Sequence, residues 1–444
     1  MFENVLGQQA VSRLIQDINS GVLAPAMLFS GPAASGKGTA ALELGRIISC
    51  EMENRAVWDC ACPACARHRL LIHPDLLCLG KRSFSAEITA SAKAFLRENT
   101  VPTRLLYIRS VRKLLSRFNP VLLEDDPKAK ALSPLLNSLE EDLDELEFLT
   151  ENQTSQDAAS INKLIEGMLK SAYKLESEGM GEYIPINQLR RAAYWGRLAP
   201  AGRGKLLLIE NADRMQEESR NSLLKLLEEP HARLTLVLTT SRMGTMLPTM
   251  LSRLRPYHFF ARDSEVEEEV IRRVFKDKAE GNIEKGNNLI SEYLDSFLPV
   301  SSSTLEALAA FFAASLAYKA VLISKKQNRE LPEEAVLLGK YCALKAEAAG
   351  FGRPQDKLEA VIKLILEKAE KFEIRSLFSR FLVCLLEQFS QSQKTGSFPP
   401  GVSCFSLWRD AVNIADNAVN IYNLRPAPVL EKLYTDLSKG LGEL

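Results

Sequence analysis

Three short apolar runs in the first 260 positions of the chain each end at small or polar residues. They cover residues 26–30, 206–209 and 235–240. Apolar runs of this length, bounded by turn-forming residues, are typical of buried strands. We therefore predict a β-sheet whose strands lead into polar loops.

Between residues 76 and 183 the apolar positions take helical spacing. Two series advance in steps of four and three residues: Leu132, Leu136, Leu139, Leu143 and Leu146; then Ile161, Ile165, Met168, Ala172 and Leu175. This spacing places each series on one helix face. The polar stretch 150–160 between them predicts an antiparallel helical hairpin. A third segment completes a small bundle through Leu105, Ile108, Val111, Leu115 and Phe118.

From Arg262 onward the pattern is helical throughout. A capping arrangement at residues 264–267 opens a helix that continues toward Phe275. Further amphipathic segments are predicted at 287–298, 303–323, 333–349, 355–371, 374–393 and 404–423. In the last segment and just after it, we expect four residues to pack in a core: Trp408, Ile414, Val419 and Leu424.

Composition fits a globular protein of roughly two to four domains. The 444 residues hold 56 Lys+Arg and 56 Asp+Glu, so a global basic field for nucleic acid or membrane is excluded. No apolar run approaches the length of a membrane span, and the start lacks a signal-peptide layout, so we expect a cytoplasmic protein. In that setting clustered cysteines indicate a metal site rather than disulfides.

A glycine-rich stretch follows the first predicted strand. Gly31, Gly36 and Lys37 match the pattern G-x-x-x-x-G-K, whose backbone N–H groups and lysine hold phosphates. The loop also contains Ser35, and Gly38 stands where a Ser or Thr usually binds Mg²⁺, with Thr39 one place late. We predict nucleotide binding here, with a ligand-free glycine turn as the alternative.

The second predicted strand ends in Glu210-Asn211-Ala212-Asp213. In P-loop ATPases this position supplies an Asp for Mg²⁺ and then a Glu that activates water. Glu210 is therefore the candidate metal ligand, but Asn211 occupies the catalytic position. An amide cannot accept a proton at neutral pH, so we expect no or weak ATP hydrolysis by this chain alone.

Four cysteines lie within sixteen residues where the helix after the glycine-rich loop should end. They are Cys50, Cys60, Cys62 and Cys65. Four thiolates close a tetrahedral Zn²⁺ shell and leave no position for catalysis, which favours a structural zinc. His68 is a possible substitute ligand, and free or redox thiols are the alternative.

These motifs, in this order, resemble bacterial DNA polymerase III clamp-loader subunits of the AAA+ class. The resemblance rests on the loop, the cysteine insert and five further segments: residues 2–8 (FENVLGQ), 73–76 (HPDL), 213–215 (DRM), 221–230 (NSLLKLLEEP) and 247–253 (LPTMLSR). It covers about 1–81 and 184–262 well. It implies an α/β P-loop domain (1–262) with a zinc module (about 50–68) and a helical insertion (about 82–183). An all-α lid (263–325) and an all-α collar (326–444) follow.

Within this family the sequence resembles the delta-prime type, because its second motif lacks the D-E of the ATP-hydrolysing gamma/tau subunits. The resemblance implies that Arg253 is an arginine finger, reaching ATP on a neighbouring subunit and worth roughly 10³–10⁵ in rate. It further implies partners: gamma/tau and delta subunits in a pentameric ring, the sliding clamp and primed DNA, without a membrane. Two alternatives remain, a gamma/tau-like motor and a nucleotide kinase suggested only by G-K-G-T.

The predicted insertion segregates its charges. Basic residues decorate the third segment: Arg104, Arg109, Arg112, Lys113 and Arg117. Acidic residues decorate the first hairpin helix: Glu140, Glu141, Asp142, Asp144, Glu145 and Glu147. We expect the two faces to neutralise each other. The sharper hypothesis is that the basic helix contacts DNA phosphates or an acidic partner.

Overall fold

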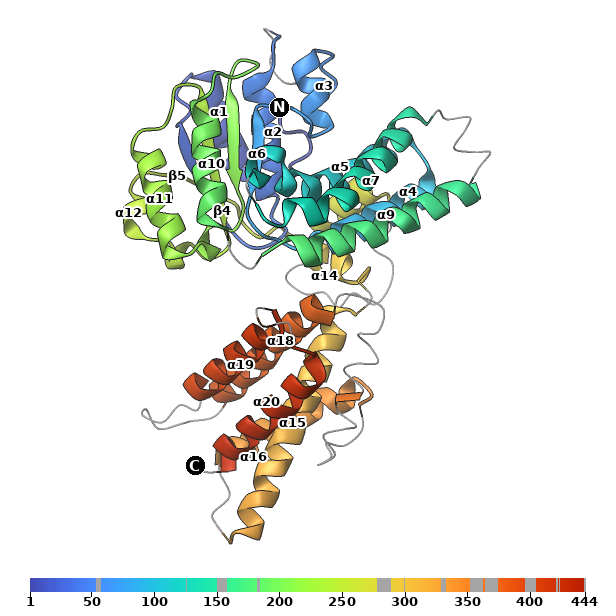
Figure 1. Cartoon of the computed structure of the whole chain (residues 1–444), viewed down its shortest axis with the longest axis vertical. Coiled ribbons are helices and arrows are strands. Elements are labelled where there is room, and N and C mark those ends of the chain that lie inside the picture. The colour runs from blue at the N-terminus through green and yellow to red at the C-terminus, as the bar shows by residue number, and fades with distance from the viewer. Residues whose placement is uncertain are drawn as a thin grey trace. The chain divides into compact units, whose positions relative to one another are not determined.

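A five-stranded parallel sheet forms the centre of the first of two units (Figure 1). The computed structural model describes residues 1–52, 57–124, 126–149, 158–181, 184–277, 289–298, 300–328, 333–351, 362–363, 374–395, 405–420, 422 and 424–442. The units are Met1–Phe297 and Leu298–Leu444. The strand order is β2-β3-β4-β1-β5, with strands β1 (Ala26–Ser30), β2 (Leu76–Leu79), β3 (Lys205–Ile209), β4 (Leu234–Thr240) and β5 (Arg255–His258). The three predicted strands are confirmed as β1, β3 and β4.

Alternate residues of β1, β2, β3 and β4 enter separate cores on the two faces of the sheet. In β1, Met27 and Phe29 pack with helices α1 (Gln9–Asn19) and α2 (Lys37–Ser49). Ala26 and Leu28 pack on the other side with α10 (Ile186–Arg197), α11 (Glu217–Glu228) and α12 (Pro248–Leu251). Strands buried on both faces read as continuous apolar runs, which explains their strong sequence signal.

The helical insertion folds as predicted, with one additional helix. Leucines of α7 (Ala129–Phe148) and apolar residues of α9 (Ala158–Gly179) share a buried core with α5 (Val101–Leu115). Helix α4 (Ser85–Glu98), which the sequence reading missed, adds Ile88, Ala92 and Phe95 to that core. The short elements η1 (Ser116–Phe118) and α6 (Pro120–Leu123) lead out of α5. Most of the predicted connector, residues 150–157, lies outside the described residues.

Two helices after the sheet pack onto the insertion. Helix α13 (Ser264–Phe275) and helix α14 (Leu289–Asp295) share an apolar cluster with Ala90 of α4. The guanidinium of Arg97, also from α4, donates to the Phe275 carbonyl at 2.8 Å and pairs with Asp277 at 2.8 Å. The insertion therefore contacts the segment that follows the sheet as well as the sheet domain.

The described part of the second unit consists of helices around α15 (Ser302–Lys326). Helix α15 packs against α16 (Glu333–Ala348), α18 (Ile374–Thr395) and α20 (Pro426–Gly442), and α19 (Phe405–Asn420) packs on α18 and α20. The sequence assigned 303–323 to the lid, whereas the contacts of α15 lie in this unit. The predicted helix at 355–371 falls almost wholly outside the described residues.

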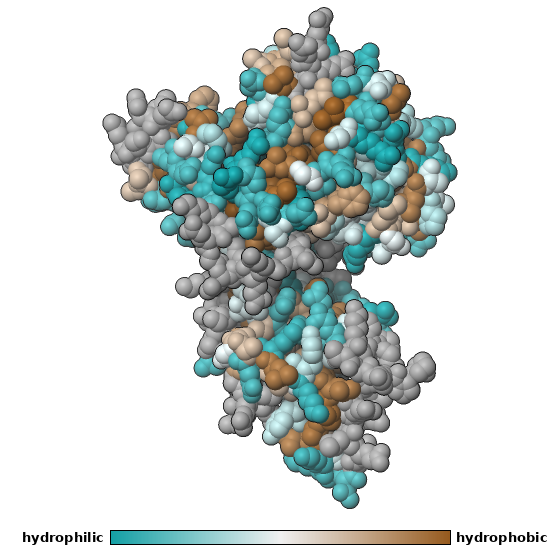
Figure 2. Space-filling view, turned by 180° about the vertical axis from the view of Figure 1, so that it is seen from behind, coloured by the Kyte–Doolittle hydropathy of each residue, from teal (hydrophilic) through white to brown (hydrophobic). Residues whose placement is uncertain are grey.

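Side-chain burial in this unit departs from expectation at two positions. Trp408 and Val419 are buried as predicted, and Trp408 stacks on Phe389. Ile414 is 63% exposed and Leu424 is 52% exposed, so the expected core role is wrong for both. Figure 2 shows apolar side chains among hydrophilic ones on the visible surface of both units.

One helix among the described residues, Ser303–Lys326, is long and apolar enough to cross a membrane. Its apolar window is 67% buried inside the unit. A helix that is apolar all round is the expected centre of a helical domain. The burial is consistent with that role, and length and composition are weak evidence for a span.

Candidate functional site

The parallel sheet brings several loops to one edge. The glycine-rich loop follows β1, Gly80 follows β2, Glu210 and Asn211 follow β3, and β4 ends at Thr240. Carboxyl ends of parallel strands lie at the same edge, which is where open α/β sheets bind ligands. The fold thus brings the predicted nucleotide residues together although they are up to 179 positions apart, between Gly31 and Glu210.

The glycine-rich loop wraps around its own lysine. Lys37 Nζ donates to the Gly31 carbonyl at 2.7 Å, to the Pro32 carbonyl, and to Ser35 Oγ at 3.3 Å. Burial lowers the pKa of the Lys37 ammonium to about 8, while the carboxylates of Glu210 and Asp213 act to raise it. A phosphate beside Nζ would favour the charged form and replace these loop contacts.

An arginine that the sequence reading missed fixes the loop. Arg262 donates from Nε to the Leu6 carbonyl at 2.9 Å and from Nη1 to the Ala34 carbonyl at 2.7 Å. It thereby ties the amino-terminal segment to the loop. Of the other predicted loop residues, Gly36 caps helix α2, and Thr39 is half-buried in its first turn. No sequence motif marks Arg262, because its partners are main-chain carbonyls distant in sequence.

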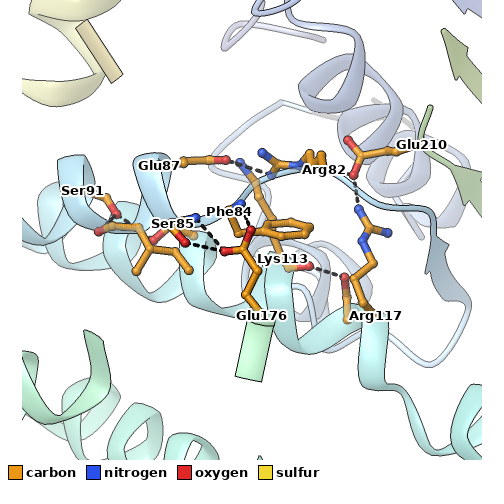
Figure 3. A network of polar contacts seen from close by, with 12 residues as sticks. Arg82, Phe84, Ser85, Glu87, Ser91, Lys113, Arg117, Glu176 and Glu210 are labelled. Atoms are coloured by element: carbon orange, nitrogen blue, oxygen red, sulfur yellow. Dashed lines mark hydrogen bonds and ion pairs between the residues drawn. The ribbon is translucent and has the colours of Figure 1, made fainter. Parts of the chain in front are cut away.

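Glu210, the predicted metal ligand, is held by two arginines of the insertion region. Arg117 Nη2 contacts Glu210 Oε2, and Arg82 Nε lies 3.3 Å from the same oxygen (Figure 3). Gly38 faces the other carboxylate oxygen. A Cβ at position 38 would lie 2.7 Å from Glu210 Oε1, so a Ser or Thr there would require the end of the Glu210 side chain to shift. Neither arginine was a predicted site residue.

Asn211 has a structural role at the position of a catalytic glutamate. Its Nδ2 donates to the Lys81 carbonyl at 2.7 Å, and its backbone is left-handed, with φ 52°. Asparagine tolerates this conformation better than most residues. A glutamate would bring a carboxylate, which only accepts hydrogen bonds, against a carbonyl oxygen. The neighbouring Gly80, at φ +103°, lies so close that a Cβ there would be 2.0 Å from the Glu210 carbonyl oxygen.

The four clustered cysteines converge at the end of α2 and on α3 (Pro63–Arg69). Their Sγ atoms all lie within 4.8 Å of one another. Cys50 Sγ and Cys60 Sγ are 3.8 Å apart. Four thiolates at about 2.3 Å from a tetrahedral zinc would be about 3.8 Å from one another, so the donor set fits Zn²⁺.

Hydrogen-bond donors around the sulfurs favour a thiolate at Cys62, whereas burial and the neighbouring thiols of Cys62 and Cys50 raise the pKa of Cys65 in the metal-free protein. Arg46 Nη1 lies 3.5 Å from Cys65 Sγ, and the Cys65 N–H donates to Cys62 Sγ at 3.4 Å. Burial raises the pKa of the Cys62 thiol, but N–H groups of Glu51 and Cys65 outweigh it and lower that pKa to about 7. Such second-layer donors are typical of metal sites.

His68 lies outside this ligand group. Its ring stacks on His73 at 4.2 Å between centroids, and both ring nitrogens are buried without a hydrogen-bond partner. Burial, the neighbouring His73 and the charges of Arg46 and Arg109 lower the pKa of His68 to about 2. His68 therefore packs as a neutral ring.

Asp75 of the HPDL segment (residues 73–76) accepts from the N–H groups of Ala201 and Gly202 at 3.0 and 2.7 Å, which anchors the chain just before β3.

Arg253 lies just after α12, on the surface of the first unit. Its side chain is 34% exposed, and it pairs with Glu228 at 2.7 Å, at the end of α11. Nη1 also donates to the Thr249 carbonyl at 2.7 Å. An exposed pair of this kind contributes about 0–1 kcal/mol, so a phosphate can compete for the guanidinium.

The basic face of α5 is turned inward. Arg104 donates to the Leu149 carbonyl, Arg109 to the Arg69 carbonyl, and Arg112 pairs with Glu147. Lys113 pairs with Glu87, and Arg117 with Glu210. Among the described residues, Arg112 is the one member of this basic set that pairs with a carboxylate of the acidic hairpin helix, so the expected neutralisation between the two faces occurs at one pair. The same contacts argue against the DNA hypothesis, since these side chains are engaged within the protein.

Removing one thiolate should empty the metal site. We expect Cys65→Ser to lose its roughly one zinc per chain and to melt at a lower temperature, because three ligands cannot close the shell. Inductively coupled plasma mass spectrometry and thermal melting measure both. Cys342→Ala, in the second unit, is the control and should keep its zinc. Equal zinc in both variants would contradict the assignment.

Restoring a glutamate should not restore hydrolysis. Asn211→Glu loses the bond to the Lys81 carbonyl and strains a left-handed position, so we expect about 1–3 kcal/mol lower stability. ATP turnover should stay at background, because Glu210 remains paired. Aspartate tolerates the left-handed backbone about as well as asparagine does. Asn211→Asp therefore removes the hydrogen bond to the Lys81 carbonyl without adding backbone strain. Rapid ATP hydrolysis by the glutamate variant would refute this interpretation.

The buried His68 should make the fold sensitive to acid. Its folded pKa lies below the unfolded value near 6.5, so the unfolded state takes up more protons as pH falls. Stability is complete above about pH 6.5 and should drop below it by about 1.4 kcal/mol per pH unit. Guanidinium unfolding at pH 7.5 and 5.5 measures this, with His68→Phe as the comparison. An equal pH slope in both proteins would disprove the assignment to His68.

Comparison with known proteins agrees with this geometry. The family model described as DNA polymerase III, delta subunit, matches residues 7–121 and 129–263, more than half of the chain. A solved DNA polymerase III gamma subunit-related protein from Thermotoga maritima is similar over 63% of this chain and 90% of that chain, at 16% identity. Its TM-score of 0.26 is too low to carry an argument. No curated protein matches the sequence. The chain belongs to the DNA polymerase III delta-subunit family and is thus a clamp-loader subunit.

Proposed function

We propose that this chain is a delta-prime-like subunit of the DNA polymerase III clamp loader. It helps to load the sliding clamp on primed DNA and donates Arg253 to ATP bound by a neighbouring gamma/tau subunit. The observation behind this proposal is the setting of Arg253. Its guanidinium is accessible in a weak surface ion pair with Glu228, and Asn211 leaves the chain's own site without a catalytic base. The gamma/tau-like motor is disfavoured because Arg117 and Arg82 already hold Glu210.

Other parts of the chain fit the same role. The cysteine cluster suits a structural zinc, which would be held by Cys50, Cys60, Cys62 and Cys65 and supply rigidity rather than chemistry. Helices α13 and α14 are the proposed lid, and the second unit is the proposed collar that joins the pentameric ring with gamma/tau and delta. This assignment implies a cytoplasmic location.

The test is ATP turnover of a reconstituted loader with clamp and primed DNA. We expect Arg253→Ala to lower turnover severalfold while assembly persists, because one interface loses its arginine finger, a group worth roughly 10³–10⁵ at a single site. Arg255→Ala is the matched control. Arg255 lies two residues away and pairs with Asp17 of the same chain at 3.0 Å, so its loss should leave turnover unchanged.

Two results would refute the proposal. One is unchanged turnover when Arg253→Ala replaces the native subunit. The other is rapid ATP turnover by the isolated chain that Lys37→Ala abolishes, which would favour the motor alternative.

A further inference from the structure

Arg117 occupies the position on Glu210 that a divalent metal would need. Its Nη2 contacts Glu210 Oε2, and the two side chains are 6% and 11% exposed. Arg82 adds a second guanidinium, with Nε 3.3 Å from the same oxygen. Figure 3 shows Arg117 reaching the Glu210 carboxylate, whereas the end of the Arg82 guanidinium is turned toward Glu87.

The two arginines are held in place by the insertion. Arg117 Nη1 donates to the Leu79 carbonyl at 3.3 Å, and Arg82 pairs with Glu87 at 2.8 Å. Both guanidiniums lie over the Phe84 ring, at 4.2 Å for Arg82 and 5.4 Å for Arg117. Lys113 holds Glu87 from the other side. Contacts from several elements make this a built arrangement rather than a loose surface pair.

Mg²⁺ does not fit this site. The hydroxyl that normally binds it is absent at Gly38, and Glu210 Oε1 already lies where that side chain would be. The remaining oxygen of Glu210 faces two cations. Mg²⁺ needs an octahedral set of oxygen ligands, and guanidiniums supply none while repelling it.

The local charge balance nevertheless suits a polyphosphate. Five cations, Lys37, Arg82, Lys113, Arg117 and Arg262, face four carboxylates, those of Glu87, Glu176, Glu210 and Asp213. Burial acts to raise the pKa of Glu87, but the charges of Lys113 and Arg82 lower it to about 2, so that carboxylate is ionised. The Nε of Arg117 is buried without a hydrogen-bond partner. The N-terminus of α2 adds backbone donors toward the same loop.

We propose that this loop binds a nucleoside polyphosphate without a divalent cation, with Arg117 and Arg82 on Glu210 supplying the positive charge that Mg²⁺ supplies in other P-loop proteins. The inference rests on the nucleotide-binding part of the proposed function, not on Arg253. A nucleotide held in this way is a structural ligand, because no metal is present to position water or a leaving group.

The test is isothermal titration of the full chain with ATP, and separately with ADP, in EDTA and in excess MgCl₂. The affinity in EDTA should equal or exceed that in Mg²⁺, and Lys37→Ala should lower it roughly tenfold or more. Tightening by roughly tenfold or more on adding Mg²⁺, or no binding in either buffer, would overturn the proposal. Arg253→Ala should bind as the native chain does, which separates this result from the arginine-finger test.

Two variants at the carboxylate sharpen the outcome. Arg117→Gln should weaken binding in EDTA. Arg97→Gln is the matched control and should bind as the native chain does, because Arg97 contacts Asp277 and the Phe275 carbonyl, outside this cluster. If Arg117→Gln fails to fold by circular dichroism and zinc content, Glu210→Gln decides. Glu210→Gln should tighten ATP binding in EDTA, because it removes a negative charge near the phosphates. If Glu210 instead held Mg²⁺, the same change would weaken ATP binding in MgCl₂.

Discussion

The buried ion pairs around Glu210 set what the rest of the first unit can do. A carboxylate placed at the end of β3 with 8% exposure must be neutralised, because an unpaired buried charge is strongly destabilising. In this chain the neutralising groups are Arg117 and Arg82 from the insertion. The insertion is therefore part of the site rather than an appendage, and the sheet edge cannot be understood without it.

Helix α5 extends this coupling beyond the sheet edge. Arg117, just past its end, reaches Glu210, whereas Arg109 and Arg112 reach carbonyls at the end of α3 in the cysteine module. The guanidiniums of Arg46 and Arg109 each lie 5.5 Å from the centroid of the Trp58 ring. Arg46 in turn contacts Cys65 Sγ. The basic residues that suggested a nucleic-acid surface instead join two modules of one domain.

The features predicted from the sequence are those that depend on residues close to one another in the chain. The β1, β3 and β4 strands are continuous apolar runs, and the insertion helices repeat their leucines, so both were predictable. The loop from Gly31 to Lys37 and the four cysteines carry their chemistry within a few residues. Helix α4 was missed because it packs through alanines as well as large residues, which weakens its apolar pattern. The Arg117 contact to Glu210 spans 93 positions, and only the folded chain reveals such a pairing.

The polar groups at the buried sheet edge and the exposed Arg253 differ in what they can do. Inside the sheet edge, Asn211 donates to a carbonyl and Glu210 is paired, so neither can activate water. At the surface, the carboxylate that Arg253 pairs with, Glu228, is itself exposed, so a phosphate can replace it at little cost. Because α4 also contacts α13 and α14 through Ala90 and Arg97, the same insertion that supplies Arg117 and Arg82 to Glu210 also packs on the segment after the sheet. This is the division of roles that we propose: the chain's own site does not hydrolyse ATP, and Arg253 acts on ATP bound by a neighbouring subunit.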